Sequence, residues 1–245
     1  MSGRILNKIV TDKLLLYVDG ANSNCYVSGS TTLYNLVNND VGSLVNGITY
    51  NTNNNGSFVL DGVNDYIDMG NKIPSLLPSY PLSIDIWVWP SSTNGVVGIF
   101  STANDTPATT YYGFSIQMNT PLSNGKYYIF ANIGDGFGRG ATNRRSFQTS
   151  TQVLVADTWN HIVATVDSGP TFQIYLNGVL QNGLNSGSGG PINWGFGTTT
   201  QIGPSTGYGA VLNGKVSNVK VYNKLLSQSE VTQNYNALKG RFGLS

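Results

Sequence analysis

The sequence is poor in charged residues, cysteine and histidine. Asp, Glu, Lys and Arg make up 10% of its 245 residues, against about 25% in typical soluble domains. The net charge is +1 and no long run of Lys or Arg is present. Nucleic acid is therefore disfavoured as a partner, because its binding needs a positive field. Cys25 and His161 are the only residues of their kinds, which excludes an intrachain disulfide and a cysteine-based zinc site.

Long hydrophobic runs are absent too. No segment approaches the roughly 18 apolar residues that cross a bilayer, so no membrane insertion is expected. Asp12 and Lys13 interrupt the apolar stretch near the N-terminus, and no small-residue cleavage site follows. The sequence therefore predicts no signal peptide, and we expect synthesis in a cytoplasm without secretion.

The usual catalytic groupings are missing as well. Glycoside hydrolysis needs a pair of carboxylates, yet Glu230 is the only glutamate. No carboxylate stands two residues from Asp85, and Asp65 and Asp68 are three residues apart, which puts them on opposite faces of a strand. His161 has no cysteine, serine elbow or second histidine as a partner. The sequence predicts that the protein is not an enzyme.

Glycine and other turn-forming residues are abundant instead. Short runs of alternating apolar and polar residues lie between them, which is the pattern of an antiparallel β-sandwich. Asn177-Gly178 predicts a type I′ hairpin, and the polar stretch 49–57 is predicted to be a loop. Strands are predicted within residues 13–20, 56–70, 81–90, 95–101, 111–118, 126–134, 159–167, 171–181, 198–204 and 214–223.

One helix is predicted near the C-terminus. Ser227 followed by Glu230 forms a capping-box pattern, and Leu226 and Val231 are spaced as a hydrophobic staple. We expect a short helix that begins at Gln228.

Two strand segments carry residues with more than one interpretation. The strand within 81–90 has an apolar face and a mixed face, and the mixed face holds Asp85, Trp87 and Trp89. That face either stacks a sugar or packs under a loop or the helix. His161 is expected to be structural and to bond a nearby loop.

Four segments follow one another in a characteristic order. They are GSFVLDGVNDYIDMG, PLSIDIWVWP, DTWNHIVATVDSGPTFQIYLNGVLQ and GKVSNVKVYNKLLSQSEV. This succession resembles the laminin-G-like branch of the concanavalin A-like lectin/glucanase superfamily. The resemblance implies an all-β, jelly-roll β-sandwich of two antiparallel sheets with binding loops on one rim.

The segments that flank these four point to a more specific group within the family. Residues 9–39 and 225–243 resemble laminin-G-like structural proteins of tailed bacteriophages. This implies a non-catalytic virion surface protein of the capsid-decoration or fibre type, present in many copies beside other virion proteins, with host-surface glycans as an expected ligand. A stand-alone, calcium-assisted carbohydrate-binding module and a purely architectural capsid protein without a ligand remain as alternatives.

The chain is expected to hold one domain. No linker or change in composition divides it, so residues 13–238 are assigned to the laminin-G-like jelly roll, residues 1–12 to an N-terminal arm and residues 239–245 to a C-terminal tail. The arm and the tail are expected to anchor the protein or to make subunit contacts in a homo-oligomer.

Calcium is the single cofactor that the resemblance implies. Calcium binds six to eight oxygens, and relatives often hold it at the rim. Asp61 and Asp65 are the ligands that the resemblance supports, with Asp19 as another. Asp-Gly and Asn-Asp sequences are also ordinary turn formers.

Three loops combine aromatic, amide and carboxylate groups, as lectin sites do. The predicted carbohydrate-binding residues are Asn104, Asp105, Tyr111 and Tyr112 in the first loop, Asp135, Phe137, Arg139 and Asn143 in the second, and Trp194 and Tyr208 in the third.

Overall fold

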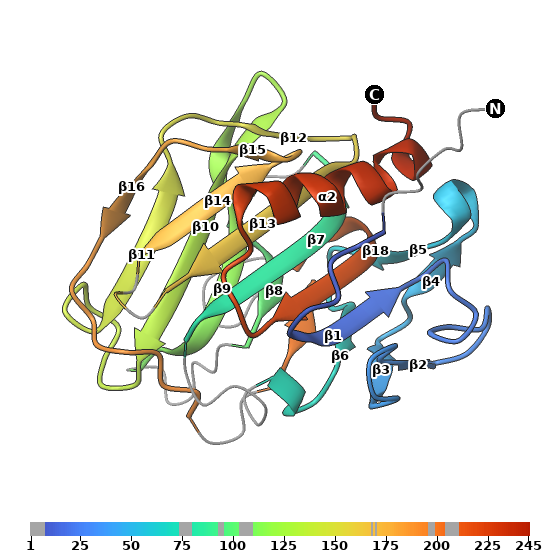
Figure 1. The fold of residues 1–245 in the computed structure, drawn as a ribbon, viewed down its shortest axis with the longest axis horizontal. Coiled ribbons are helices and arrows are strands. Elements are labelled where there is room, and N and C mark those ends of the chain that lie inside the picture. The colour runs from blue at the N-terminus through green and yellow to red at the C-terminus, as the bar shows by residue number, and fades with distance from the viewer. Residues whose placement is uncertain are drawn as a thin grey trace.

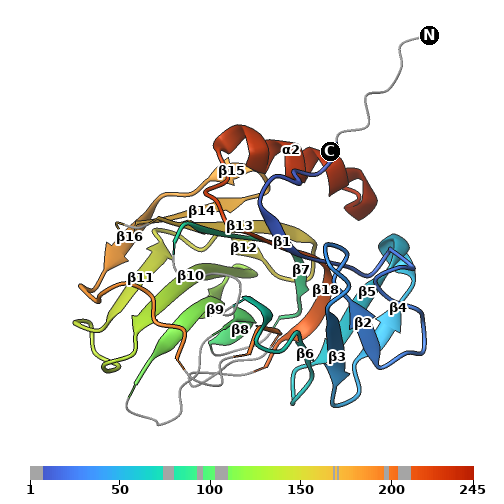
Figure 2. The same ribbon diagram turned by 60° about the horizontal axis from the view of Figure 1, so that its bottom comes forward.

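The protein folds into two antiparallel sheets packed face to face, with a helix over the outer face of one sheet (Figure 2). The computed structural model describes residues 8–73, 80–92, 96–102, 110–167, 169, 171–195, 199–203 and 211–245. The prediction of an all-β sandwich with a short C-terminal helix is confirmed.

The first sheet, sheet A, has the strand order β15-β14-β13-β7-β18-β5-β4, and β1 pairs with β18 beside this path. The last strand, β18, pairs with β5 along its first half and with β1 along its second half. The strands are β1 (Leu14–Asp19), β4 (Thr49–Asn51), β5 (Ser57–Asp61), β7 (Leu82–Pro90), β13 (Asn160–Val166), β14 (Phe172–Leu176), β15 (Val179–Leu180) and β18 (Asn213–Tyr222). Asn177 and Gly178 join β14 to β15 with φ values of 51° and 82°, which suit the predicted type I′ turn.

The second sheet, sheet B, has the order β16-β11-β10-β9-β8-β17-β6-β3-β2, with β12 paired to the start of β10. Its strands lie side by side below sheet A in Figure 2. They are β2 (Thr32–Tyr34), β3 (Val41–Val45), β6 (Tyr66–Asp68), β8 (Val97–Ser101), β9 (Tyr112–Ser123), β10 (Lys126–Asp135), β11 (Arg144–Thr149), β12 (Leu154–Val155), β16 (Gly183–Ser186) and β17 (Gln201–Ile202).

The predicted loop at 49–57 is wrong at its start. Thr49–Asn51 is the edge strand β4, and Asn53–Asn55 is a 3-10 helix, η1. The Tyr50 ring lies 5.0 Å from the Tyr26 ring and 6.2 Å from the Phe58 ring. These aromatic contacts hold as a strand a segment whose composition is that of a loop.

The C-terminal helix α2 (Gln228–Leu238) begins at the predicted residue. The Ser227 side chain accepts a hydrogen bond from the Glu230 backbone, and the Glu230 side chain accepts one from the Ser227 backbone at 2.9 Å. Leu226 and Val231 are buried in the same apolar cluster. The predicted capping box is confirmed. A 3-10 helix, η2 (Lys239–Phe242), follows directly.

The mixed face of β7 lies beneath α2 and η2, which answers the question that the alternation left open (Figure 1). Trp87 is fully buried, and its ring stacks on Phe242 at 4.2 Å and on Tyr235 at 5.8 Å. His161 is also fully buried, with Nε2 3.1 Å from Asp85 Oδ1 in a contact too poorly aligned to count as a hydrogen bond. The imidazole thus lies against a neighbouring strand. The expected bond to a nearby loop is made by the His161 backbone, whose N–H donates to Asn177 Oδ1 at 2.9 Å and whose carbonyl accepts from the Asn177 N–H at 2.8 Å.

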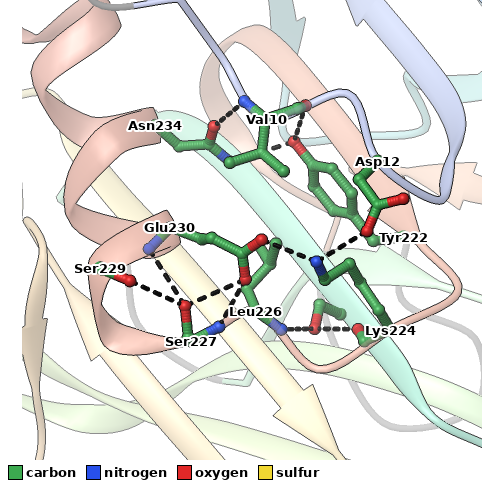
Figure 3. A network of polar contacts seen from close by, with 10 residues as sticks. Val10, Asp12, Tyr222, Lys224, Leu226, Ser227, Ser229, Glu230 and Asn234 are labelled. Atoms are coloured by element: carbon green, nitrogen blue, oxygen red, sulfur yellow. Dashed lines mark hydrogen bonds and ion pairs between the residues drawn. The ribbon is translucent and has the colours of Figure 1, made fainter.

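The described part of the N-terminal arm packs on the same layer (Figure 3). The Val10 backbone N–H donates to Asn234 Oδ1 at 2.7 Å, and the Tyr222 hydroxyl donates to the Val10 carbonyl at 3.1 Å. Asp12 forms an ion pair with Lys224 at 2.9 Å. Residues 8–12 therefore contact their own domain.

The C-terminal tail is packed in the same way. Arg241 Nη1 lies 2.7 Å from Asp19 Oδ1, and the Arg241 guanidinium also donates to the carbonyls of Asn54 and Gly56. Phe242 is 6% exposed.

None of the helices in the described residues has the length and hydrophobicity of a membrane span.

Candidate functional site

A cleft of about 610 Å³ opens where β9 begins and β10 ends. We call it the rim cleft. One wall carries Tyr112 of β9, and another carries Asp135 of β10 with Phe137 in the turn that follows. Residues 190–195, which lie between β16 and β17, complete it. The cleft thus joins residues from all three loops that the sequence singled out.

Asp135 ties together the segments around the cleft. Its side chain accepts hydrogen bonds from the backbone N–H of Phe137 and of Gly190, each at 3.0 Å, and from Asn143 Nδ2 at 3.4 Å. The residue is only 7% exposed. These contacts fix the carboxylate and leave its remaining lone pairs as possible acceptors for ligand hydroxyls.

The Tyr112 ring is held between two glycines. A Cβ added at Gly136 would lie 2.4 Å from Tyr112 Cε1, and one added at Gly195 would lie 2.8 Å from Tyr112 Cδ1. Both glycines also have positive φ, 81° and 65°, which other residues rarely adopt. The sequence around the ring therefore depends on glycine to admit an aromatic group.

Two further aromatic side chains border the cleft. Phe137 is 81% exposed, whereas Trp194 is half-buried against the core. The Trp194 indole N–H is buried and has no acceptor among the described residues. The exposed and the anchored ring together offer apolar surface to the flat face of a sugar.

The segment 190–195 is pinned by backbone hydrogen bonds. The Ile192 N–H donates to the Tyr80 hydroxyl at 2.8 Å, and the Asn193 N–H donates to the Gly134 carbonyl at 2.9 Å. Burial raises the pKa of Tyr80 to about 12, so the hydroxyl stays protonated at neutral pH. The wall of the cleft is preformed, which lowers the ordering cost of binding.

The structure brings four of the predicted carbohydrate-binding residues together, namely Tyr112, Asp135, Phe137 and Trp194. Asn143 does not line the cleft, but its side chain donates a hydrogen bond to Asp135. Tyr111 is fully buried, with its hydroxyl 2.6 Å from Ser115 Oγ, so its side chain is not available to a ligand. Arg139 is half-buried and does not line the cleft.

Three predicted residues, Asn104, Asp105 and Tyr208, lie outside the described residues. Sequence reasoning missed Pro191 and Asn193, which also line the cleft. Their position next to Trp194 in a glycine-rich stretch was the available signal.

The three candidate calcium ligands differ in the contacts that their side chains make. Asp19 is engaged by Arg241 and by the Tyr17 hydroxyl at 2.9 Å. Asp61 and Asp65 lie together, since the Asp61 N–H donates to Asp65 Oδ2 at 3.1 Å. Burial raises the pKa of the Asp65 carboxyl, and its Oδ1 has no hydrogen-bond partner among the described residues.

The described residues contain no cluster of three or more His, Cys, Asp or Glu side chains that could hold a metal. A calcium ion at Asp61 and Asp65 would therefore need amide, carbonyl or water oxygens as its other ligands.

Several solved structures share the fold. Domain 4 of AbnA, an extracellular arabinanase from Geobacillus stearothermophilus solved with arabinotriose, has a TM-score of 0.63 and 16% identity, over 91% of this chain and 98% of that one. The binding domain of botulinum neurotoxin DC in complex with SialylT has a TM-score of 0.64 and 16% identity, over 93% and 52%. Trypanosoma rangeli sialidase has a TM-score of 0.63 and 15% identity, over 95% and 34%.

The chain thus spans about half of the neurotoxin binding domain and a third of the sialidase. Among curated proteins, no sequence matches this chain. The family model Laminin_G_3, described as the concanavalin A-like lectin/glucanases superfamily, matches residues 61–232, which is more than half of the chain. This protein belongs to the Laminin_G_3 family of the concanavalin A-like lectin/glucanase superfamily.

Proposed function

We propose that this protein is a non-catalytic glycan-binding protein displayed in many copies on the virion surface of a tailed bacteriophage. The observation that carries the glycan-binding part is the rim cleft, where Phe137 and Trp194 flank the fixed carboxylate of Asp135. Aromatic faces stack on the apolar face of a sugar ring, and a carboxylate accepts hydrogen bonds from its hydroxyls.

The relatives support glycan as the ligand class. The arabinanase domain was solved with arabinotriose, and the neurotoxin binding domain was solved with SialylT. At 16% identity these proteins share the fold, so the choice of sugar is left to this chain's own side chains.

The absence of catalysis is proposed from the carboxylates. Asp135 is the single carboxylate among the described residues that line the rim cleft. Hydrolysis of a glycosidic bond needs a second one across the scissile bond. One carboxylate suffices to orient a sugar.

Virion display rests on the resemblance of residues 9–39 and 225–243 to phage structural proteins. A shallow sugar site binds weakly on its own, but many copies on one particle raise the avidity by about 100- to 10,000-fold. Mass spectrometry of purified phage particles should detect the protein in many copies. Its absence from particles would refute the display proposal, but it would not affect the proposal that the rim cleft binds a glycan.

A glycan array tests the binding proposal. The purified protein, fused to a multivalent carrier, should bind a subset of glycans saturably. Phe137→Ala and Trp194→Ala should each weaken that binding about tenfold or more, because each removes a stacking surface. The matched control is Tyr34→Ala, which changes an exposed aromatic residue on β2. Unchanged binding by both cleft variants would refute the rim cleft as the site.

Calcium is included in the same experiment. We expect Asp61 and Asp65 to hold the ion if it binds, so the array is run with calcium and with a chelator. An effect of calcium that Asp65→Asn abolishes would assign the ion to this pair, and the absence of any effect would remove calcium from the proposal.

A further inference from the structure

A second hollow lies on the outer face of sheet B. Two adjoining hollows of about 380 and 290 Å³ share Tyr128 and Ser150 as lining residues. They therefore form one groove, which we call the β10 groove. Tyr128 and Phe130 of β10 form its floor. Residues of β11 and β16 line it beside Phe130, and Asn124 and residues 150–152 line it beside Tyr128. It shares no lining residue with the rim cleft.

The strand register sets a row of side chains across the groove. Phe130 pairs with Gln117 of β9 on one side and with Gln148 of β11 on the other, and Gln148 pairs with Leu184 of β16. Paired residues point to the same face of a sheet. An aromatic ring thus lies between two amide side chains, with an apolar residue at the end of the row.

The amides in this row are not used by the protein itself. The side chains of Gln117 and Gln148 make no hydrogen bond within the part of the chain that the structure describes. Neither amide is among the fully buried polar groups that lack a partner, so the polar atoms of both reach solvent. In the next row, by contrast, Asn132 Oδ1 accepts a bond from Ser146 Oγ at 2.6 Å. An amide that reaches solvent and is not bonded within the protein can donate to and accept from ligand hydroxyls.

The floor of the groove is rigid. Tyr128 and Phe130 alternate with Tyr127, Ile129 and Ala131, which are buried in the sandwich core. Strand β10 lies between β9 and β11 and pairs with both. Side chains on such a strand are preorganised, so little conformational entropy is lost when a ligand binds.

We propose that the β10 groove is a second carbohydrate-binding site, for a neutral, unbranched oligosaccharide that lies along β10. The distance from Lys126 to Phe130 along the strand is about 13 Å at 3.3 Å per residue, which is longer than a single sugar ring. Tyr128 and Phe130 stack on sugar faces, and the Gln148 amide, which lines the groove beside Phe130, bonds hydroxyls. The ligand is neutral because Lys126 is the one charged residue among the described residues that line the groove.

This inference rests on the proposed function only for the ligand class, since its residues are separate from those of the rim cleft. Two sites on one chain would add valence within each copy, and that raises avidity beyond what display alone provides.

The test is titration calorimetry with linear cello-, xylo-, manno-, malto- and arabino-oligosaccharides of increasing length. At least one of them should bind the intact protein, and Tyr128→Ala should weaken that binding about tenfold or more. Gln148→Leu, which removes the amide but keeps the volume, should weaken it severalfold. Tyr34→Ala, on the opposite edge of sheet B, should bind as the wild type does.

The variants separate this inference from the proposed function. Binding that is lost in Tyr128→Ala and kept in Phe137→Ala supports the groove even if the rim cleft fails. Binding that is kept in Tyr128→Ala and Gln148→Leu but lost in Phe137→Ala overturns the groove alone. Silence of the wild type across all five series overturns the groove as well.

Salt tests the charge of the ligand. Between about 0.01 M and about 1 M NaCl the affinity should stay within a factor of two, because screening weakens charged contacts and leaves neutral ones unchanged. A steep fall with salt that Lys126→Ala removes would overturn the assignment of a neutral ligand.

Discussion

The outer faces of the two sheets differ in what covers them. On sheet A, the outer face carries Asp85, His161 and Lys220, and α2, η2 and residues 8–12 seal all three from solvent (Figures 1 and 2). On sheet B, the outer face carries Tyr128 and Phe130 in an open groove. In the sequence, the strands of both faces show a similar mixture of aromatic and polar residues. A strand face that carries both aromatic and polar residues is open to a ligand only where no other element covers it.

The covered face is held by a buried polar group. Lys220 Nζ donates to Asp85 Oδ1 at 2.7 Å, and Asn234 Nδ2 donates to Asp85 Oδ2 at 2.8 Å. Burial alone would raise the pKa of the Asp85 carboxyl. The nearby Lys220 ammonium and His161 lower the pKa by more than burial raises it, so it lies below the ordinary range of an aspartate. The carboxylate is charged, and both of its oxygens accept hydrogen bonds from buried side chains, so it holds the covered face together.

The largest effect is expected from Asp85→Ala, which breaks the covered face. It leaves the Lys220 ammonium buried without a counter-charge, and loss of one partner of a buried pair costs about 3–5 kcal/mol. Urea denaturation measures the free energy of unfolding. The control is Asp12→Ala, whose partner Lys224 lies near the surface, with an expected cost below about 1 kcal/mol. Equal effects of the two variants would contradict the buried ion pair.

A pH series tests the same carboxylate. A depressed pKa in the folded state means that ionised Asp85 stabilises the fold above the unfolded pKa of about 3.9. That contribution is lost as the pH falls from there toward the folded pKa. The difference in unfolding free energy between the wild type and Asp85→Ala should be constant from about pH 6 to about pH 8 and should shrink below about pH 4. A constant difference down to about pH 2 would contradict the assignment.

The next effect is expected from Phe242→Ala, which uncovers the aromatic residues under η2. The Phe242 ring lies 4.2 Å from Trp87 and 4.6 Å from Trp159, and truncation of a buried phenylalanine costs about 3–5 kcal/mol. Tryptophan fluorescence should shift to the red as water reaches both indoles. The control Phe137→Ala removes an exposed ring and should change stability by less than about 0.5 kcal/mol. An unchanged spectrum in Phe242→Ala would show that the tail does not cover this face.

A smaller effect is expected from Asn234→Ala, which separates the arm from the helix. The Val10 N–H loses its acceptor, and Asp85 loses one donor, at a cost of about 1–3 kcal/mol. Native-state hydrogen exchange should show loss of protection at the Val10 amide. Gln233→Ala, which removes an exposed bond to the Lys8 carbonyl, should leave that amide protected. Equal exchange in both variants would contradict a role for Asn234 in arm docking.

The sequence predicted the elements that local patterns determine. Alternation of apolar and polar residues located β7, and the Ser227 and Glu230 pair located the start of α2 at Gln228. The edge strand β4 escaped because its composition is that of a loop, and it is held by pairing with β5 and by the contact of Tyr50 with Tyr26, which lies before β2 in the sequence. Local patterns report local energetics and miss strands that only tertiary contacts stabilise.

The sites were predicted to the extent that they lie in single loops. Asp135 and Phe137 are two residues apart, and a mixture of aromatic and carboxylate groups was enough to select both. The row of Gln117, Phe130 and Gln148 forms only through the strand register. The seal over Asp85 needs Asn234, 149 residues away. Neither arrangement has a signal in a short window of sequence.

The smallest effect on stability is expected from Tyr128→Ala, and it sharpens the comparison within a single strand. Tyr127 is fully buried in the core, whereas Tyr128 is half-buried on the floor of the β10 groove. Tyr127→Ala should cost about 3–5 kcal/mol, in the range for a large buried side chain, and Tyr128→Ala less than about 1 kcal/mol.

Urea denaturation of both variants measures the difference. A small cost for Tyr128→Ala would agree with the proposal that this ring serves binding and not the packing of the fold. If Tyr128→Ala were as destabilising as Tyr127→Ala, the outer face of sheet B would be a structural face like that of sheet A, and the groove would be a packing feature of the fold.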